Sequence, residues 1–293
     1  MKLSPLTYLL LFLSATIAMG QERVSIYPAD SSLGSVTLEI YAAENPKAAV
    51  VVCPGGSYCW LDYNGEGVEV AKFLQQNGIS AFVLRYRVAG WWAWATHYRV
   101  LFRGHLAPDM YNDGQAALRW VAANASRYGI RPSTIGIMGF SAGGHLAMSQ
   151  AVYPDDVRPA FVAPIYPVVT MTADCVHKRS RRGLLGERRT RTLERMNRWS
   201  LERNITKDCP PTFLVNCIDD PVVDYRNSVL LDSALTATGV KHLYIQYQTG
   251  GHGFGVSESK GSPECRPWKY RFLEWLETLM PMRNEELGMR NEE

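Results

Sequence analysis

The chain has 293 residues, of which 46% are hydrophobic and 20% are charged, as in an ordinary globular protein. Its formal net charge of +3 is too small to indicate a nucleic-acid partner, and none is expected. Beyond the N-terminal segment no apolar stretch approaches the length that spans a membrane, so no membrane span is expected.

The first residues of the chain have the layout of a secretory signal. A lysine precedes an apolar run at residues 8–13, and small residues at 18–20 stand where a signal peptidase cleaves. The apolar run is too short to span a bilayer on its own. We therefore expect that residues 1–20 are removed, that Gln21 opens the mature chain, and that the protein is exported to the periplasm or the extracellular space.

The next segments alternate apolar with polar residues. Residues 23–27 and 35–41 indicate half-buried antiparallel strands at one edge of a sheet. The continuous β-branched run 48–53 ends at a Pro-Gly-Gly loop, which predicts a fully buried strand. A helix is predicted over 66–76, because its apolar residues lie on one side and an Asn-Gly pair ends it.

The same strand-and-helix unit recurs along the rest of the chain. Further strands are predicted over 80–86, 134–138, 160–165, 212–217 and 242–247, and further helices over 113–126, 143–151, 224–238 and 263–280. Alternating strands and helices require a mostly parallel sheet with helices on both faces. The predicted fold class is therefore α/β, with about eight strands.

Two segments interrupt this alternation, and both fall beyond the carboxyl ends of predicted strands, where α/β sheets usually place substrate-handling loops. Residues 88–111 are dense in aromatic side chains. Residues 175–208 carry many arginines and few acids. Each segment has a second interpretation that the sequence leaves open: the first as an insertion packed on the body, and the second as a solvated basic face.

All six cysteines lie in the part of the chain that follows the predicted signal. They are Cys53, Cys59, Cys175, Cys209, Cys217 and Cys265. Export would permit disulfides, and the pair expected to form one is Cys175 with Cys209. Cys53 and Cys217 end apolar runs and are expected to be buried thiols. No pair has the spacing of a metal site, so neither a metal nor another cofactor is predicted.

Residues 139–143 read Gly-Phe-Ser-Ala-Gly and match the pattern Gly-x-Ser-x-Gly. A predicted strand leads into this motif and a helix of small residues leads out, so the serine lies on a strand-to-helix turn, as a nucleophile elbow requires. The turn is sharp, and side chains at Gly139 and Gly143 would collide with the neighbouring strand and helix. Ser141 is therefore the predicted nucleophile.

A serine hydroxyl is a weak nucleophile, so it needs a base and a carboxylate that orients the base. His252 lies in a glycine-rich loop after the last predicted strand. Asp219 and Asp220 follow the strand at 212–217, and their positions leave open which of them faces His252. The order serine, aspartate, histidine is that of the α/β hydrolases.

A tetrahedral intermediate also needs N–H donors aimed at its oxyanion. The N–H of Ala142 lies at the start of the predicted elbow helix, where the helix dipole favours negative charge. Gly56, and after it Ser57, follow the buried strand at 48–53 and are the candidates for the remaining donors.

Four ordered motifs, residues 54–58, 137–147, 219–223 and 250–255, resemble the acetyl esterase and acetyl xylan esterase-like branch of the α/β hydrolases. The resemblance runs from about Ala48 to Leu276. It implies the α/β-hydrolase fold. The length of the chain predicts one catalytic domain over 21–281, and the polar, charged composition of 282–293 predicts a tail. The resemblance also implies that the triad acid is the aspartate directly before the x-Val-Val stretch, which is Asp220.

The resemblance implies hydrolysis of short acyl esters, often acetyl groups on plant polysaccharides, so a small-molecule or carbohydrate ester is the expected partner. Tyr58 and Phe140 are bulky neighbours of the nucleophile and would keep the acyl side small. Trp91, Trp92 and Trp94 would stack on sugar faces, or form the core of their own insertion. The chain departs from the family pattern at Ser57, where a third glycine is usual, at Asp224, where a proline is usual, and in the length of 88–111.

Two rival functions remain open. A peptidase of the prolyl-oligopeptidase kind uses the same fold and triad, but it normally carries a large N-terminal domain that has no room before the core strands here. A hydrolase-like binding protein without catalysis is the second rival. It is disfavoured because all three triad positions are occupied.

Overall fold

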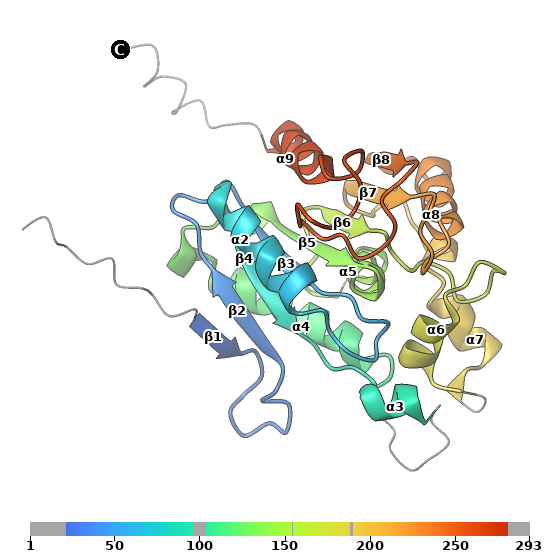
Figure 1. Ribbon diagram of the computed structural model, residues 1–293. Coiled ribbons are helices and arrows are strands. Elements are labelled where there is room, and N and C mark those ends of the chain that lie inside the picture. Colours follow the sequence, from blue (N-terminus) through green and yellow to red (C-terminus); the bar gives the residue numbers. More distant parts are fainter. Residues whose placement is uncertain (1–21, 97–103, 154, 188–189, 281–293) are drawn as a thin grey trace, which may run out of the picture.

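The computed structural model describes most of the chain (Figure 1). The described residues are 22–96, 104–153, 155–187 and 190–280. The predicted signal peptide, 1–20, and the predicted polar tail, 282–293, fall outside these ranges. The division of the chain into signal, domain and tail therefore stays a prediction. None of the described helices is long and apolar enough to cross a membrane.

An eight-stranded sheet forms the centre of the molecule (Figure 1). Its strands are β1 (Glu22–Ser25), β2 (Thr37–Tyr41), β3 (Ala48–Cys53), β4 (Ile79–Arg85), β5 (Ile135–Phe140), β6 (Val162–Ile165), β7 (Thr212–Cys217) and β8 (His242–Tyr247). They lie in the order β1-β2-β4-β3-β5-β6-β7-β8. Only the pairs β1–β2 and β2–β4 are antiparallel. The predicted α/β class and the mostly parallel sheet are confirmed.

Helices cover both faces of this sheet. The described helices include the π-helix η1 (Asn64–Val68), α2 (Glu69–Gln76), α4 (Asp109–Ala123), α5 (Ala142–Val152), α8 (Arg226–Ala237) and α9 (Trp268–Leu279), and, in the two inserted segments, α3 (Trp91–Ala95), α6 (Lys178–Leu185) and α7 (Leu193–Arg198). Side chains of α4, α5 and α8 pack in the core on one face, and those of α2 and α9 in the core on the other. Helix α4 begins four residues before its predicted start, directly after Pro108.

The central strand β3 shows why this sequence forms a two-sided sheet. All six of its residues are buried. Ala49, Val51 and Cys53 pack in one core, whereas Ala48, Val50 and Val52 pack in the other. Since alternate residues of a strand point to opposite faces, an uninterrupted apolar run is what a strand with both faces covered requires.

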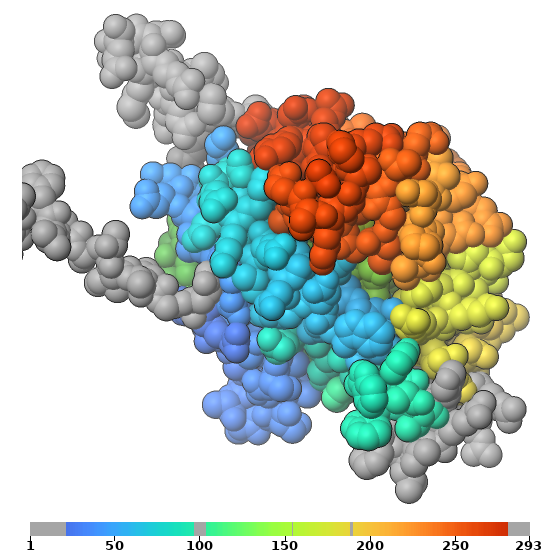
Figure 2. All heavy atoms as spheres, viewed as in Figure 1, coloured from blue at the N-terminus to red at the C-terminus, as the bar shows by residue number. Residues whose placement is uncertain are grey.

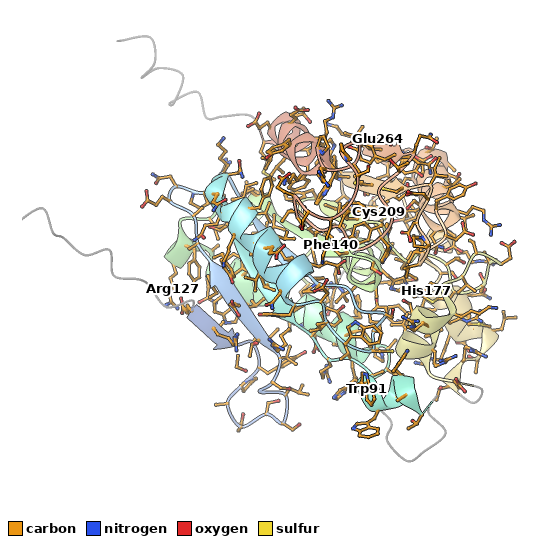
Figure 3. All side chains as sticks on the ribbon, in the orientation of Figure 1. Trp91, Arg127, Phe140, His177, Cys209 and Glu264 are labelled. Atoms are coloured by element: carbon orange, nitrogen blue, oxygen red, sulfur yellow. The ribbon has the colours of Figure 1, made fainter. Side chains whose placement is uncertain are left out.

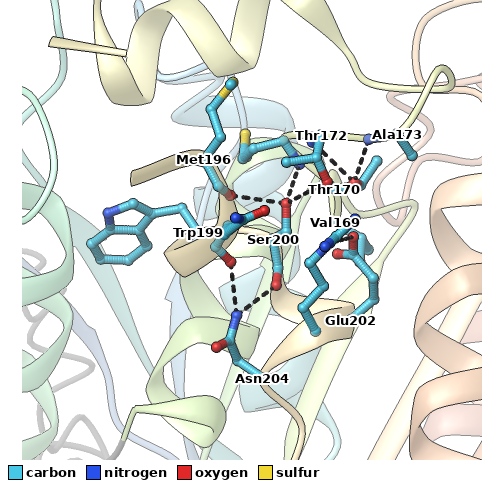
Figure 4. Close-up of polar contacts among 12 residues, drawn as sticks. Val169, Thr170, Thr172, Ala173, Met196, Trp199, Ser200, Glu202 and Asn204 are labelled. Atoms are coloured by element: carbon cyan, nitrogen blue, oxygen red, sulfur yellow. Dashed lines mark hydrogen bonds and ion pairs between the residues drawn. The ribbon is translucent and has the colours of Figure 1, made fainter. Parts of the chain in front are cut away.

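The arginine-rich segment 175–208 is anchored to the body of the protein. The buried Ser200 hydroxyl accepts a hydrogen bond from the N–H of Met171, at 2.9 Å, and donates one to the carbonyl of Met196, at 2.9 Å (Figure 4). The amide of Asn204 donates to the carbonyl of Ser200, at 2.8 Å. Leu184, Leu185, Trp199 and Leu201 of this segment are buried. These side chains belong to the same core as those of α4, α5 and α8, so the segment packs on the body and is more than a solvated basic face.

The disulfide predicted between Cys175 and Cys209 is wrong. All six cysteines are buried free thiols. Cys209 lies against the end of α5, where its thiol donates to the carbonyl of Ala151. The carbonyl of Cys175 instead accepts from Asn227 on α8, at 2.9 Å. Cys175 thus lies in a turn beside α8, whereas Cys209 lies at the end of α5, a separation that sequence spacing does not reveal.

Candidate active site

Ser141 stands on the sharp turn between β5 and α5. Its backbone is in an uncommon conformation, with φ of 54° and ψ of −118°. A Cβ on Gly139 would lie 2.0 Å from the carbonyl oxygen of Gly143, and a Cβ on Gly143 would lie 2.1 Å from that of Cys53. Those contacts are far inside van der Waals distance, so both positions must be glycine. The predicted steric role of the two glycines is confirmed.

The structure brings together the three residues predicted for the triad. His252 Nε2 lies 2.9 Å from Ser141 Oγ, and His252 Nδ1 lies 2.6 Å from Asp220 Oδ2. A carboxylate only accepts, so Nδ1 carries the ring proton and Nε2 is left with a lone pair for the serine hydroxyl. The triad is largely shielded from water, since only 4% of Ser141 is exposed.

Each of the two adjacent aspartates holds a different part of the histidine loop. The second oxygen of Asp220 accepts from the N–H groups of Val222 and Val223, at 2.8 and 2.9 Å, which fixes the carboxylate beside the imidazole. Asp219 accepts from the N–H groups of Gly250 and Gly251, at 3.2 and 2.8 Å. Asp220 thus orients the ring, whereas Asp219 ties down the backbone that carries it.

The predicted oxyanion loop lies directly against the nucleophile. A Cβ on Gly55 would be 2.9 Å from the Cβ of Ser141. The N–H of Gly55 donates to Glu66, at 2.7 Å, and is therefore engaged. Within the described part of the chain, the N–H groups of Gly56 and Ser57 have no protein acceptor. Ala142 is the first residue of α5, so its N–H has no partner within the helix. All three remain candidate donors.

Two residues predicted to line the acyl side lie in the hydrophobic core instead. Phe140 is fully buried on the α2 and α9 side, in the interior seen in Figure 3. Tyr58 is buried on the opposite side of the sheet, and its backbone has a positive φ of 61°. Both predictions are wrong, because closeness to Ser141 in the sequence does not give the direction of a side chain.

Tyr58 instead joins the oxyanion loop to the 175–208 segment through His145. The Tyr58 hydroxyl lies 2.7 Å from His145 Nδ1, and His145 Nε2 lies 2.9 Å from the carbonyl of Trp199. A carbonyl only accepts, so Nε2 carries the proton and Nδ1 accepts from the tyrosine. Burial lowers the pKa of His145 to about 4, which keeps this link neutral.

An aromatic cluster extends outward from the oxyanion loop. The ring of Trp60 lies beside Gly56, and Trp94 packs on it edge to face with ring centroids 6.0 Å apart. Trp91 packs on Trp94 and on Trp92, with centroid distances of 5.6 and 5.4 Å. Trp91 and Trp92 are 56% and 65% exposed, so the cluster ends on the surface. Trp60 belongs to no motif, and no sequence signal identified it.

Helix α6 borders the same region. It lies next to α3 on one face of the molecule, where the two appear in yellow and teal (Figure 2). Its N-cap, His177, is labelled in Figure 3, and burial and then the charge of His252 lower the pKa of His177 to about 4. The guanidinium of Arg179 stands 5.8 Å from the ring centroid of Trp60. The basic segment therefore reaches the triad and the aromatic cluster.

A serine on the turn after β5, an aspartate after β7 and a histidine after β8, on a mostly parallel sheet, define an α/β hydrolase. The chain belongs to the BD-FAE family, whose profile matches residues 38–235, more than half of its length. No group of three or more His, Cys, Asp or Glu side chains among the described residues is arranged to hold a metal ion.

Similar proteins include named esterases and a xylanase. The acetylxylan esterase of Xylanibacter ruminicola is 30% identical over 226 residues, which is 76% of this chain and 44% of that protein. The endo-1,4-beta-xylanase B of Butyrivibrio fibrisolvens is 33% identical over 223 residues, 72% of this chain and 33% of that protein. The chain thus spans less than half the length of these curated relatives.

A solved structure shares the whole architecture. The acetyl ester-xyloside bifunctional hydrolase from Caldicellulosiruptor lactoaceticus superimposes with a TM-score of 0.76 and 26% identity, over 88% of this chain and 96% of that one. The predicted likeness to the acetyl xylan esterase-like branch of the α/β hydrolases is confirmed.

We expect Ser141→Ala to abolish ester hydrolysis in a protein that stays folded, because no acyl-enzyme can form. Loss of such a nucleophile typically lowers kcat by a factor on the order of 10⁶. Turnover of nitrophenyl acetate and the circular dichroism spectrum of the purified variant test this. Residual activity above a few per cent would show that Ser141 is not the nucleophile.

The two aspartates should differ in their effects. Asp220→Asn should lower kcat by about 10⁴-fold, since an amide at this position favours the wrong histidine tautomer. Asp219→Asn should cost far less, because it loses only backbone contacts of the loop. Steady-state kinetics of the two isosteric variants, measured side by side, give the ranking. The reverse order would move the triad acid to Asp219.

Proposed function

We propose that this chain is an exported serine carboxylesterase that hydrolyses short-chain acyl esters, chiefly acetyl esters on plant polysaccharides such as xylan. The observation that carries the proposal is the hydrogen-bonded series from Ser141 through His252 to Asp220 beside an oxyanion loop. The names of the relatives support the choice of ester and polysaccharide. The signal-like residues 1–20 support export.

The geometry supports a two-step acyl transfer. Ser141 Oγ attacks the ester carbonyl while His252 Nε2 takes its proton, and the carbonyl oxygen becomes an oxyanion that accepts from free N–H groups near Gly56 and Ala142. The alcohol leaves with the proton held on His252. Water then attacks the acyl-serine while His252 takes its proton, and as the second tetrahedral intermediate collapses His252 returns that proton to Ser141 Oγ and the carboxylic acid is released.

The acyl group should be short. Ser141 is only 4% exposed, so access to its hydroxyl is narrow. We expect kcat/KM on nitrophenyl esters to fall steeply from acetate to octanoate, because a longer chain has to displace packed side chains. A series from acetate through butyrate and hexanoate measures this. A preference for octanoate would contradict the acetyl assignment and indicate a lipase-like substrate.

The alcohol side should be a sugar that stacks on the exposed indoles of the aromatic cluster, because such rings offer broad apolar area at little entropic cost. We expect Trp91→Ala with Trp92→Ala to lower kcat/KM about tenfold for an acetylated xylo-oligosaccharide, equivalent to about 1.4 kcal/mol. Nitrophenyl acetate, which carries no sugar, should be hydrolysed as before.

A matched control for this test lies on α9. Tyr270 is another exposed aromatic residue, 51% accessible, and its ring packs on Phe73 of α2, so it belongs neither to the triad nor to the aromatic cluster. Tyr270→Ala should leave kcat/KM unchanged for both the acetylated xylo-oligosaccharide and nitrophenyl acetate. An equal loss on both substrates in the tryptophan variant would mean that the cluster supports the fold and does not bind sugar.

A further inference from the structure

Glu66 is a buried carboxylate beside the nucleophile that the triad does not use. It lies on η1, and only 3% of it is exposed. Its Oε2 accepts from the N–H of Gly55, at 2.7 Å, and its Oε1 accepts from the hydroxyl of Tyr166, at 2.9 Å. No lysine or arginine in the described ranges pairs with it. An unpaired buried carboxylate is costly, so its retention needs a specific reason.

Tyr166 continues the contact from Glu66 to the histidine loop. Its hydroxyl oxygen accepts from the N–H of Gly255, at 3.1 Å, and its ring lies under that of His252 with centroids 4.7 Å apart. A Cβ on Gly255 would also lie only 2.7 Å from the carbonyl oxygen of Gly65. The histidine loop thus packs directly on η1, the turn that carries Glu66.

A carboxylate is the group that these contacts require. Both partners of Glu66, an N–H and an O–H, are donors, and each needs an acceptor. Glutamine offers one acceptor and one donor, so it can keep the contact to Gly55 but cannot also accept from the Tyr166 hydroxyl, whose proton would lose its buried acceptor. An ionised acceptor also polarises the Tyr166 hydroxyl, which strengthens its oxygen as acceptor for Gly255.

We propose that Glu66 is a positioning residue for the hydrolysis, holding the oxyanion loop at Gly55 and, through Tyr166, the loop of His252 in a single mutual geometry. This inference rests on the proposed esterase function. Both loops supply groups that act most strongly in the transition state, since the oxyanion and the imidazolium form together. A small shift of either loop therefore slows the chemical step more than it weakens substrate binding.

Glu66→Gln tests the proposal, because it keeps the shape of the side chain. We expect kcat for nitrophenyl acetate to fall about 10-fold to 100-fold, with KM changed less than about threefold. Tyr166→Phe, which keeps the ring under His252 and removes the hydroxyl, should give a similar split. The double variant should lose less than the product of the two single effects, because both break one linkage.

Glu39→Gln is the matched control. Glu39 is also a buried carboxylate that accepts from tyrosine hydroxyls, Tyr41 at 2.7 Å and Tyr63 at 3.2 Å, but it lies on β2, three places from β5 in the sheet order, and pairs with Arg23. Its variant should lower the Tm at most, with kcat unchanged. If Glu66→Gln lowers the Tm as Glu39→Gln does and leaves kcat at the wild-type value, Glu66 has only a structural role and the proposal is overturned.

Labelling of Ser141 by a fluorophosphonate separates this proposal from the proposed function. The rate of labelling depends on the nucleophile, its base and the oxyanion loop, and the assay needs no natural substrate. Wild type should label, Ser141→Ala should not, and Glu66→Gln should label at least about tenfold more slowly. Equal labelling of Glu66→Gln and wild type would overturn the positioning role, whatever esters the enzyme hydrolyses. Normal labelling of wild type without ester hydrolysis would overturn the function alone.

Discussion

The close approach of β5 and α5 at Ser141 is the constraint on which the rest of the site depends. With no space for a Cβ at Gly139 or Gly143, the backbone of Ser141 is held at φ 54°, a conformation that costs energy for a residue with a side chain. The N–H of Ser141 donates to Ile165, and its carbonyl accepts from Val168, both from the neighbouring β6 side. These contacts fix the direction of the hydroxyl before any substrate binds.

Polar contacts then bring the other loops to that fixed hydroxyl. Carboxylates supply most of them: Asp220 at the imidazole, Asp219 at the loop backbone and Glu66 at the oxyanion loop. Each carboxylate accepts from backbone N–H groups or from the ring N–H of His252. These hydrogen bonds fix the position of a short irregular loop as firmly as ladder hydrogen bonds fix a strand. Such preorganisation lets N–H groups stabilise an oxyanion without reorganisation during the reaction.

Sequence patterns predicted the parts of this structure that follow from local rules. The bounds of β3, β7 and β8 were predicted to the residue, because each is a run of strand formers between clear turn signals. The turn that carries Ser141 followed from its glycines. The start of α4 was placed too late, although Pro108 marks it.

The remaining features depend on contacts between distant segments. Glu66 accepts a hydrogen bond from Tyr166, which lies 100 residues away along the chain. The two sulfur atoms that do approach each other, those of Cys217 and Cys265, meet beside Gly250, where a Cβ would lie 2.5 and 2.6 Å from them. Neither pair has a spacing that would single it out. Residues at such sites are recognisable only once the sheet order has brought their loops to one edge.

Two histidines near the site, His145 and His177, keep one protonation state over the neutral pH range. Burial lowers the pKa of both His145 and His177 to about 4. Both are therefore neutral above about pH 5. Above about pH 5 the link from Tyr58 through His145 to Trp199 therefore keeps one hydrogen-bond pattern. The same holds for His177 at the start of α6. A loss of activity on acidification between about pH 8 and pH 5 therefore cannot arise from the titration of either residue.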